Sequence, residues 1–330
     1  MIVPRFWAEA RIQQRHEDRQ VTIRRFGWSS ESQEDADKRA AERAREAWAR
    51  FEGGEKVDRR ERKVPYNGAE GVPIREEIVL VQGEQVVTRN VYGALCLNSP
   101  NVLFADIDLV FEEATAWLPA VSLVLAAALC LCLKMYYKLD LGWGTALGIF
   151  LMVFLAFWLF WALWVRLTRT RKGRQAYQEV ARNRIGTFVA KHPDWRLRIY
   201  ETPAGLRLLA IHRTFAPDEP EVLELFSEVG ADKFFVKMCQ RQNCFRARVS
   251  PKPWRIGIET HMRPAGVWPV DPQRLPERRA WVETYERQAE NFASCRFLEE
   301  LGNGAKDPEC CAVLALHDRL CKSDTELPLA

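Results

Sequence analysis

The chain has 330 residues, of which 48% are hydrophobic and 28% are charged, and its formal net charge is +4. This composition excludes an intrinsically disordered protein, because it supplies ample apolar surface for a packed core. Nine scattered cysteines, two of them (Cys130 and Cys132) inside an apolar segment, exclude a disulfide framework and favour a reducing compartment. The first residues lack the apolar run of a secretory signal peptide, so we expect the N-terminal part to stay in the cytoplasm.

Residues 1–66 are expected to form a charged N-terminal helical segment. A helix is predicted at about Glu31–Phe51, with Ser30 or Ser32 as its N-cap and Gly53-Gly54 as its stop. Its surface is mostly Ala, Arg and Glu, which is typical of a solvated packing element. We assign it no chemistry.

Residues 67–114 are expected to be the first half of a cytoplasmic α+β domain. Alternating apolar and polar residues predict an antiparallel meander of four strands. These strands are expected at Ile74–Gln82, Gln85–Arg89, Gly93–Leu97 and Val102–Leu109.

Residues 115–165 predict a transmembrane helical hairpin with helices at about residues 115–133 and 144–165. Each run has no charged side chain and is close to the ~20 residues that cross a bilayer. The five cations that follow the second helix, between Arg166 and Arg174, outnumber the two lysines of the connecting loop. This bias places both termini in the cytoplasm, and predicts a multi-pass protein of the cytoplasmic (inner) membrane with the lipid bilayer as a partner.

Residues 166–330 are expected to form the second half of the same domain, ending in helices. Strands are predicted at Leu197–Glu201, Leu206–His212, Phe245–Val249 and Arg255–Ile258, and helices at Gln175–Lys191, Glu219–Val229, Arg279–Leu301 and Pro308–Lys322. The predicted fold class is therefore α+β, an antiparallel sheet with flanking helices that is interrupted by the two-helix transmembrane hairpin.

Two carboxylates end the last predicted strand of the meander. Asp106 and Asp108 are two positions apart, so in a strand they point to one face about 6.5 Å apart. Such a pair could hold Mg²⁺ or Mn²⁺, which prefer oxygen ligands. The alternative is that the Asp-x-Asp marks only a strand end or a helix cap.

Basic residues gather after the apolar segment, with twelve Lys/Arg against three Asp/Glu between Arg166 and Arg213. In the predicted hairpin, Gly205 would let a polyanion approach the backbone and Arg207 would contact phosphate. Arg246 and Arg248 would share one strand face, with Lys252 after them. The alternatives are an ordinary turn with a surface arginine, and a solvated edge strand protected by charge.

The order of these motifs resembles the archaeo-eukaryotic primase superfamily. That family has an Asp-x-Asp strand, a small-residue hairpin, a later acidic residue and a basic strand; Arg207 stands here where the family has His. The resemblance implies that Asp106, Asp108 and Asp232 are catalytic metal ligands, and that Arg246, Arg248 and Lys252 contact phosphates. The function it implies is a membrane-anchored, primase-like domain that binds nucleotide or nucleic acid.

Two other hypotheses stay open. The chain could be a non-catalytic membrane scaffold whose basic face docks anionic lipid or a partner protein. It could be a haloacid dehalogenase-like phosphatase, which also places Asp-x-Asp after an apolar strand. Cys310, Cys311, His317 and Cys321 could also ligate zinc on a helix, but their irregular spacing makes buried thiols and a helix-surface histidine the favoured interpretation.

Overall fold

A computed structural model describes residues 1–63, 73–108, 151–161, 163, 171–264 and 267–330. The chain divides into two compact units, one made of Met1–Ile107 with Arg184–Ala330, and the other of Asp108–Asn183. The first unit contains almost all of the described strands. The site discussed below lies entirely within it.

The N-terminal part of the first unit is a β-hairpin covered on one face by a helix. Strands β1 (Phe6–His16) and β2 (Arg19–Ser29) pair antiparallel along their whole length. Helix α1 (Gln33–Glu52) begins at Ser32, whose hydroxyl accepts from the Asp35 N–H and so caps the helix. Gly27 lets the helix approach closely, because a Cβ there would lie 2.2 Å from the Ala40 nitrogen.

The first of two four-stranded sheets has the order β3-β4-β5-β9 and is antiparallel throughout. Its strands are β3 (Glu77–Gln82), β4 (Gln85–Arg89), β5 (Leu95–Ser99) and β9 (Phe245–Arg248). Helix α7 (Leu275–Ala289) is held to this sheet by the buried Tyr285, whose hydroxyl lies 2.5 Å from the Ser250 hydroxyl.

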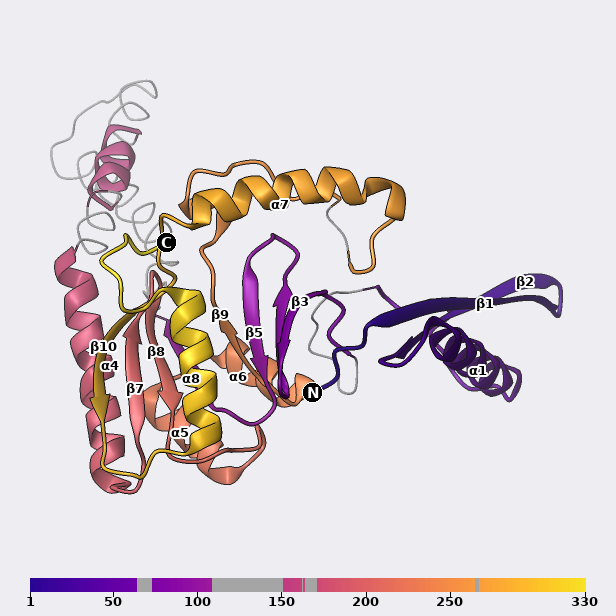
Figure 1. Ribbon diagram of the computed structural model, residues 1–330. Helices are drawn as coiled ribbons and strands as arrows, with labels where there is room; N and C mark the ends of the chain where they lie inside the picture. The colour runs from indigo at the N-terminus through magenta and orange to yellow at the C-terminus, as the bar shows by residue number, and fades with distance from the viewer. Residues whose placement is uncertain (64–72, 109–150, 162, 164–170, 265–266) are drawn as a thin grey trace, which may run out of the picture. The chain divides into compact units, whose positions relative to one another are not determined.

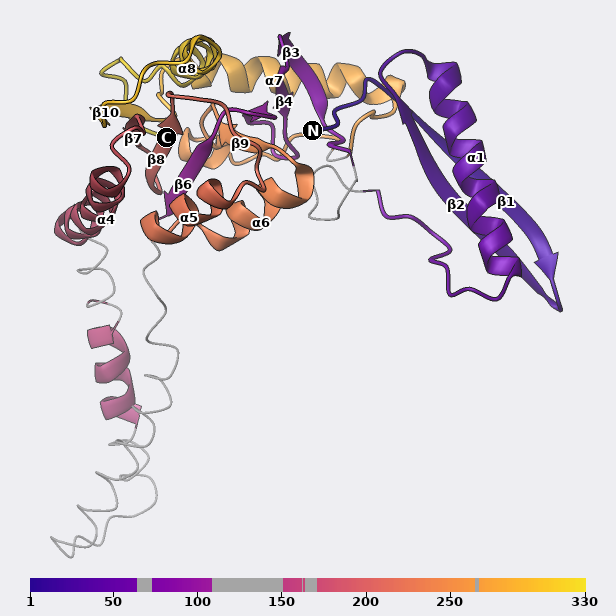
Figure 2. The same ribbon diagram turned by 90° about the horizontal axis from the view of Figure 1, so that it is seen from below.

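The second sheet has the order β10-β7-β8-β6 and carries the candidate site. Its strands are β6 (Phe104–Asp108), β7 (Leu197–Glu201), β8 (Gly205–Ala210) and β10 (Arg296–Leu301). Helix α8 (Pro308–Cys321) covers one face, while α5 (Pro220–Val229) and α6 (Lys233–Gln242) lie on the opposite side (Figures 1 and 2). Strands from both sides of residues 109–170 therefore share both sheets.

The predicted α+β class with antiparallel strands and flanking helices is confirmed, but the single sheet that was predicted is two sheets. The strand predicted as the fourth of the meander, β6, pairs with β8 in the second sheet rather than with β5. Two predicted elements are wrong. Residues predicted as a strand at Arg255–Ile258 instead begin in the 3₁₀ turn Pro253–Arg255, whose first residue is a proline with a fixed backbone φ and no N–H donor. The helix predicted to reach Leu301 ends at Ala289, and β10 follows it as an edge strand.

Three elements were not expected from the sequence. Strands β1 and β2 occupy the segment predicted to be helical only, and α6 begins where no helix was predicted. Helix α4 (Arg171–Lys191) extends the helix predicted at Gln175–Lys191 by four residues toward the N-terminus.

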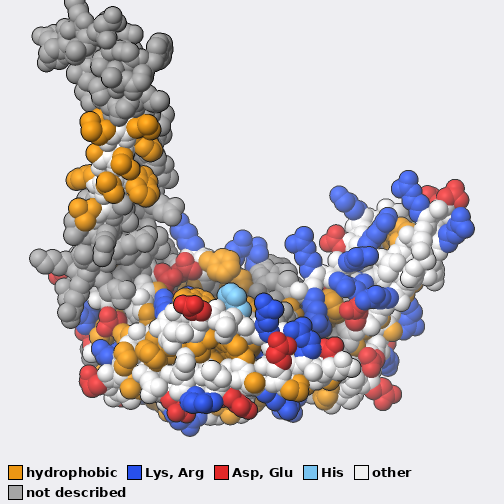
Figure 3. All heavy atoms as spheres, turned by 90° about the horizontal axis from the view of Figure 1, so that it is seen from above, with side chains coloured by type: hydrophobic (Ala, Val, Ile, Leu, Met, Phe, Trp, Pro, Cys, Tyr) orange, Lys and Arg blue, Asp and Glu red, His pale blue; other side chains and the backbone are white. Residues whose placement is uncertain are grey.

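The predicted transmembrane helix at residues 115–133 lies outside the described residues, as does much of the one at residues 144–165. Residues 151–161 form a helix with strongly exposed apolar side chains, which Figure 3 shows as orange spheres. The exposed side chains include Leu151, Met152, Leu155, Trp158, Leu159 and Phe160. Over the part of the chain that the structure describes, no helix has both the length and the apolar character required to cross a membrane.

Candidate metal centre

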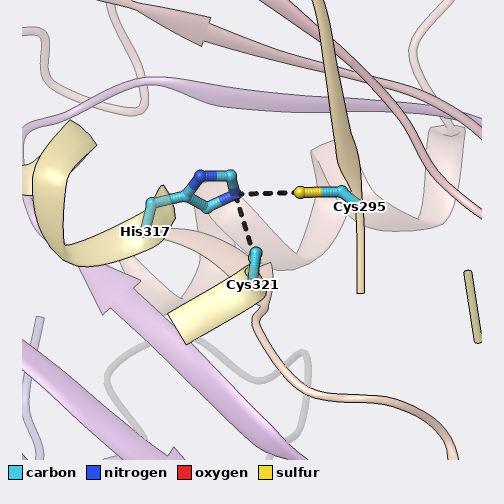
Figure 4. Close-up of side chains that lie close together, drawn as sticks. All are labelled: Cys295, His317 and Cys321. Carbon is cyan, nitrogen blue, oxygen red and sulfur yellow. Dashed lines mark hydrogen bonds between the residues drawn. The ribbon is translucent and has the colours of Figure 1, made fainter. Parts of the chain in front are cut away.

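Three potential metal ligands, Cys295, His317 and Cys321, meet between the second sheet and α8 (Figure 4). Cys295 immediately precedes β10, and the other two side chains are one turn apart on α8. Residues four apart on a helix lie on the same face, so α8 presents both toward Cys295. Asp307 starts this helix by accepting from the Cys310 N–H at 2.9 Å.

The ligand atoms of these three residues lie within 4.8 Å of one another, and all three side chains are completely buried. His317 Nε2 is 3.4 Å from Cys321 Sγ and 3.9 Å from Cys295 Sγ. Around a tetrahedral zinc ion, with sulfur at about 2.3 Å and nitrogen at about 2.0–2.1 Å, each sulfur lies about 3.5 Å from the nitrogen. The spacing is thus close to what one zinc ion requires.

Asp318 orients the histidine. Its Oδ1 atom lies 2.9 Å from His317 Nδ1, while Arg198 Nη2 donates to its Oδ2 atom at 3.2 Å. A carboxylate at Nδ1 fixes the proton on that nitrogen, so that the lone pair of Nε2 points to the two sulfur atoms. This carboxylate–histidine arrangement is the usual second layer of a zinc site.

The cluster favours one thiolate even without an ion. The hydrogen bond from the Cys321 thiol is the main cause that lowers the pKa of Cys295 to about 5; His317 and Arg207 act in the same direction, and burial opposes them. Burial raises the pKa of Cys321 well above its usual value. Burial alone would lower the pKa of His317, but its hydrogen bonds to Asp318 and Cys295 raise it. An anionic sulfur is the form that binds metal.

Arg207 is the fourth neighbour of the cluster. Its Nη1 atom lies 3.5 Å from His317 Nε2 and donates to the Arg248 carbonyl at 2.8 Å. Its Nε and Nη2 atoms donate to the two carboxylate oxygens of Asp106 at 2.7 and 3.1 Å. Burial would lower the pKa of Arg207, but the Asp106 carboxylate outweighs it and keeps the guanidinium charged. The guanidinium therefore joins both sheets to the Cys–His group.

The structure brings together two of the three predicted catalytic aspartates. The Asp232 N–H donates to the Asp106 carbonyl at 2.9 Å. The Asp232 carboxylate caps α6 by accepting from the Phe235 N–H at 2.7 Å, while the Asp106 carboxylate binds Arg207. Asp108 is exposed at the end of β6 and belongs to the other compact unit. We therefore propose no site that it shares with Asp106 and Asp232.

The predicted phosphate-binding residues have other partners. Arg246 binds both oxygens of the buried Glu76 at 2.9 and 2.8 Å. Gly205 donates its N–H to the Thr202 hydroxyl at 3.0 Å and closes the turn before β8. Lys252 lies over the Trp254 ring at 5.4 Å. The guanidinium of Arg207 donates to the Asp106 carboxylate and to the Arg248 carbonyl. We therefore propose no common anion site for these residues.

The sequence predicted His317 on the helix surface rather than as a zinc ligand, which is wrong, because the side chain is fully buried. Cys295, which lies 22 residues before the histidine, was not considered as a ligand. The His-x-x-x-Cys spacing on a predicted helix is the signal that could have found the pair. The other two cysteines that were considered do not join the group. Cys310 donates to the Arg213 carbonyl at 3.1 Å, and Cys311 lines an open groove of about 580 Å³ with Asp318 and Arg319.

Within the described residues, the Cys–His group is the one place where three or more potential ligands lie close enough to hold an ion. Its ligands are soft, whereas Mg²⁺ and Mn²⁺ take oxygen. Comparisons with models of protein families, with curated proteins and with solved structures found no match to this chain. The function is therefore argued from the site.

Proposed function

We propose that this is a zinc-binding protein in which Cys295, His317 and Cys321 hold one Zn²⁺. The observation that supports this is the separation of His317 Nε2 from the two sulfur atoms, 3.4 and 3.9 Å, together with Asp318 behind the imidazole. A thiolate-rich site with imidazole selects zinc over the oxygen-seeking cations.

The role proposed for the ion is structural. All three ligands are fully buried, so a substrate would have no access to the ion. Three protein ligands leave the fourth position of a tetrahedral zinc to water or to another group. Zinc would tie the start of β10 to the last turn of α8. It would also neutralise the Cys295 and Cys321 thiolates that metal binding requires next to the Asp106–Arg207 pair.

The test is to measure zinc in the purified full chain. We expect about one zinc per chain, as three clustered ligands imply, and loss of that zinc in Cys295→Ser and in Cys321→Ser. Cys311→Ser is the matched control, because this cysteine lies on the same helix outside the group. Cobalt substitution adds a visible spectrum that reports thiolate ligation in a tetrahedral site.

Two results would reject the proposal: a wild-type protein that takes up no zinc after reduction and loading, or a Cys311→Ser variant that loses as much metal as Cys295→Ser. In the first case the group would be a metal-free network of thiolate, imidazole and guanidinium.

A second proposal is the primase-like binding of nucleotide or nucleic acid, which rests on the order of motifs in the sequence. A backbone hydrogen bond places two of its three aspartates, Asp106 and Asp232, next to each other. The cleanest variant is Asp232→Asn, because asparagine also caps helices and keeps α6 in place. Mg²⁺-dependent nucleotide binding by the wild type and its loss in Asp232→Asn would support this function. Binding that ignores the substitution would remove Asp232 from it.

A third proposal concerns location. The exposed apolar side chains of residues 151–161 support insertion of this segment into a bilayer, as part of the membrane hairpin that the sequence predicts. We expect the full chain to float with liposomes and to resist washing with salt. A double substitution of Leu155 and Phe160 by Glu should reduce that association, whereas release of the wild type by salt alone would contradict it.

A further inference from the structure

Three arginines stand in one row across the N-terminal hairpin. Arg11 of β1 is directly opposite Arg24 of β2. Arg24 in turn forms a parallel bridge with Arg60, fixed by hydrogen bonds from Arg24 N–H to the Arg59 carbonyl and from Glu61 N–H to the Arg24 carbonyl. Adjacent strands lie about 4.8 Å apart, and residues in register point to the same face. The three guanidinium groups therefore share one face.

That face is the one turned away from α1. Ala8, Ala10 and Ile12 of β1 pack with α1, and alternation along the strand sends Arg11 to the other side. The same alternation sends Arg59 and Glu61 toward the helix, where Glu61 binds Arg43 of α1 at 2.9 Å. Arg60, between them, points away.

A small cavity lies in this row. Its volume is about 130 Å³, and its lining residues are Arg11, Thr22, Arg24 and Arg60. Thr22 is two positions before Arg24 on β2, so its side chain points to the same face. Three guanidinium groups and a hydroxyl thus surround a volume that fits a single tetrahedral anion.

The charges around the cavity are not balanced by the described residues. Glu9 is shared, with its Oε1 atom 2.7 Å from Arg11 Nε and 3.9 Å from Arg24 Nη1. No carboxylate among the described residues is paired with Arg60, and Arg24 Nε is buried without a hydrogen-bond partner there. Like charges directly opposite each other destabilise a sheet. Burial is the main cause that lowers the pKa of nearby Lys63; the charges of Arg75 and Arg24 also lower it, and Glu9 opposes them.

We propose that this cavity binds a phosphate group, either as inorganic phosphate or as the phosphate of a small monoester. A dianion would offset the surplus charge of the row, and the planar fork of arginine matches the oxygens of phosphate. The small volume suits the phosphate group alone, so the rest of an ester would remain in solvent. This site is independent of the zinc site and of the second sheet.

The experiment is calorimetric titration of the full chain with inorganic phosphate and with glycerol phosphate at constant ionic strength. We expect both ligands to bind wild type, and Arg60→Gln and Arg11→Gln to weaken each by about tenfold or more, as loss of one charged hydrogen-bond donor implies. Arg15→Gln is the matched control. Arg15 projects from the same face of β1, opposite Gln20 and outside the cavity, and should leave binding unchanged.

A second measurement tests the charge argument itself. In phosphate-free buffer at low salt, Arg60→Gln should not lower the melting temperature, because it relieves repulsion, while phosphate should raise the melting temperature of wild type only. Absence of saturable phosphate binding by wild type would overturn the proposal. So would equal weakening by Arg15→Gln, or binding that appears only with an oligonucleotide, since either would indicate a diffuse basic surface.

Discussion

The Arg207 side chain is almost completely buried, and its charge is compensated mainly by Asp106, whose side chain is 28% exposed. Removing one partner of a buried pair leaves the other charge unpaired in a poorly solvated site, and this is worse than removing both. The contact at Nη1 with the Arg248 carbonyl adds a second group that would lose its donor. Each residue of the pair is therefore needed to compensate the charge of the other in this core.

We expect Arg207→Met alone to lower the free energy of unfolding by about 3 kcal/mol, the lower end for buried pairs, because Asp106 keeps some contact with water. The double variant Asp106→Leu/Arg207→Met should cost less than the sum of the two single substitutions. Urea denaturation of the four proteins measures this cycle. Additive effects would show that the two side chains do not depend on each other.

His212 makes the stability of the fold depend on pH. Burial lowers the pKa of its imidazole below 6.5, and its Nδ1 atom accepts from the Arg196 N–H at 3.2 Å. The unfolded chain therefore binds more protons just below pH 6.5, so stability is full above this pH and falls as the pH decreases through it.

We expect His212→Gln to remove this loss, because an amide can still accept from the Arg196 N–H but does not titrate. The difference in unfolding free energy between wild type and variant, measured from about pH 7.5 to about pH 5.5, should change with a slope below about 1.4 kcal/mol per pH unit, the limit for one proton. A constant difference across this range would contradict the assignment.

At the scale of elements, α8 depends on its first turn as well as on its ligands. The Asp307 carboxylate caps the helix by accepting from the Cys310 N–H at 2.9 Å, and His317 lies more than two turns further along the helix. We expect Asp307→Ala to lower the free energy of unfolding by about 1 kcal/mol and Asp307→Asn by only a few tenths, since asparagine is an equally good cap. Zinc content should stay the same in both. An Asp307→Asn variant as unstable as Asp307→Ala would indicate a role beyond capping.

Elements with a clear hydrophobic periodicity, or with clear turn and capping residues at their ends, were predicted well. Strands β4 and β7 have the predicted bounds, and α8 begins at the predicted Pro308. The strands β2 and β10 were missed because their residues do not alternate between an apolar and a polar face. All six residues of β10 are half-buried, and β2 carries the adjacent Arg24 and Arg25, one on each face. In β1, four consecutive polar or charged residues at its end likewise interrupt the alternation.

The site was harder to predict than the fold, for a physical reason. The Asp106 and Arg207 positions were singled out, but a sequence cannot show that two opposite charges bind each other across neighbouring strands. Likewise, His317 and Cys321 have helical spacing, whereas Cys295 reaches them only because β10 folds back as the edge of the sheet. Ligands brought together by tertiary structure leave no local spacing to detect.

At the scale of the larger compact unit, Arg207 connects two sheets. It lies on β8 of one sheet and donates to the Arg248 carbonyl on β9 of the other, and both strands bury their inward residues fully. Because both sheets bind this guanidinium and His317 contacts it, a substitution of Arg207 should destabilise both sheets. Coupling between the sheets requires that the region around Arg207 has a closed and an open state. Amide hydrogen exchange detects such local opening.

We expect Arg207→Met to speed amide hydrogen exchange in β8, the strand that carries Arg207, and also in β5 and β9 of the other sheet. Arg278→Met is the matched control, because Arg278 is also nearly buried in an ion pair, at 2.8 Å from Glu77, but joins α7 to β3 within one side of the unit. That variant should speed exchange near α7 and β3 and leave β7 and β8 protected. If Arg207→Met affected β8 alone, the two sheets would be stable independently, and the buried guanidinium would serve only the sheet that carries it.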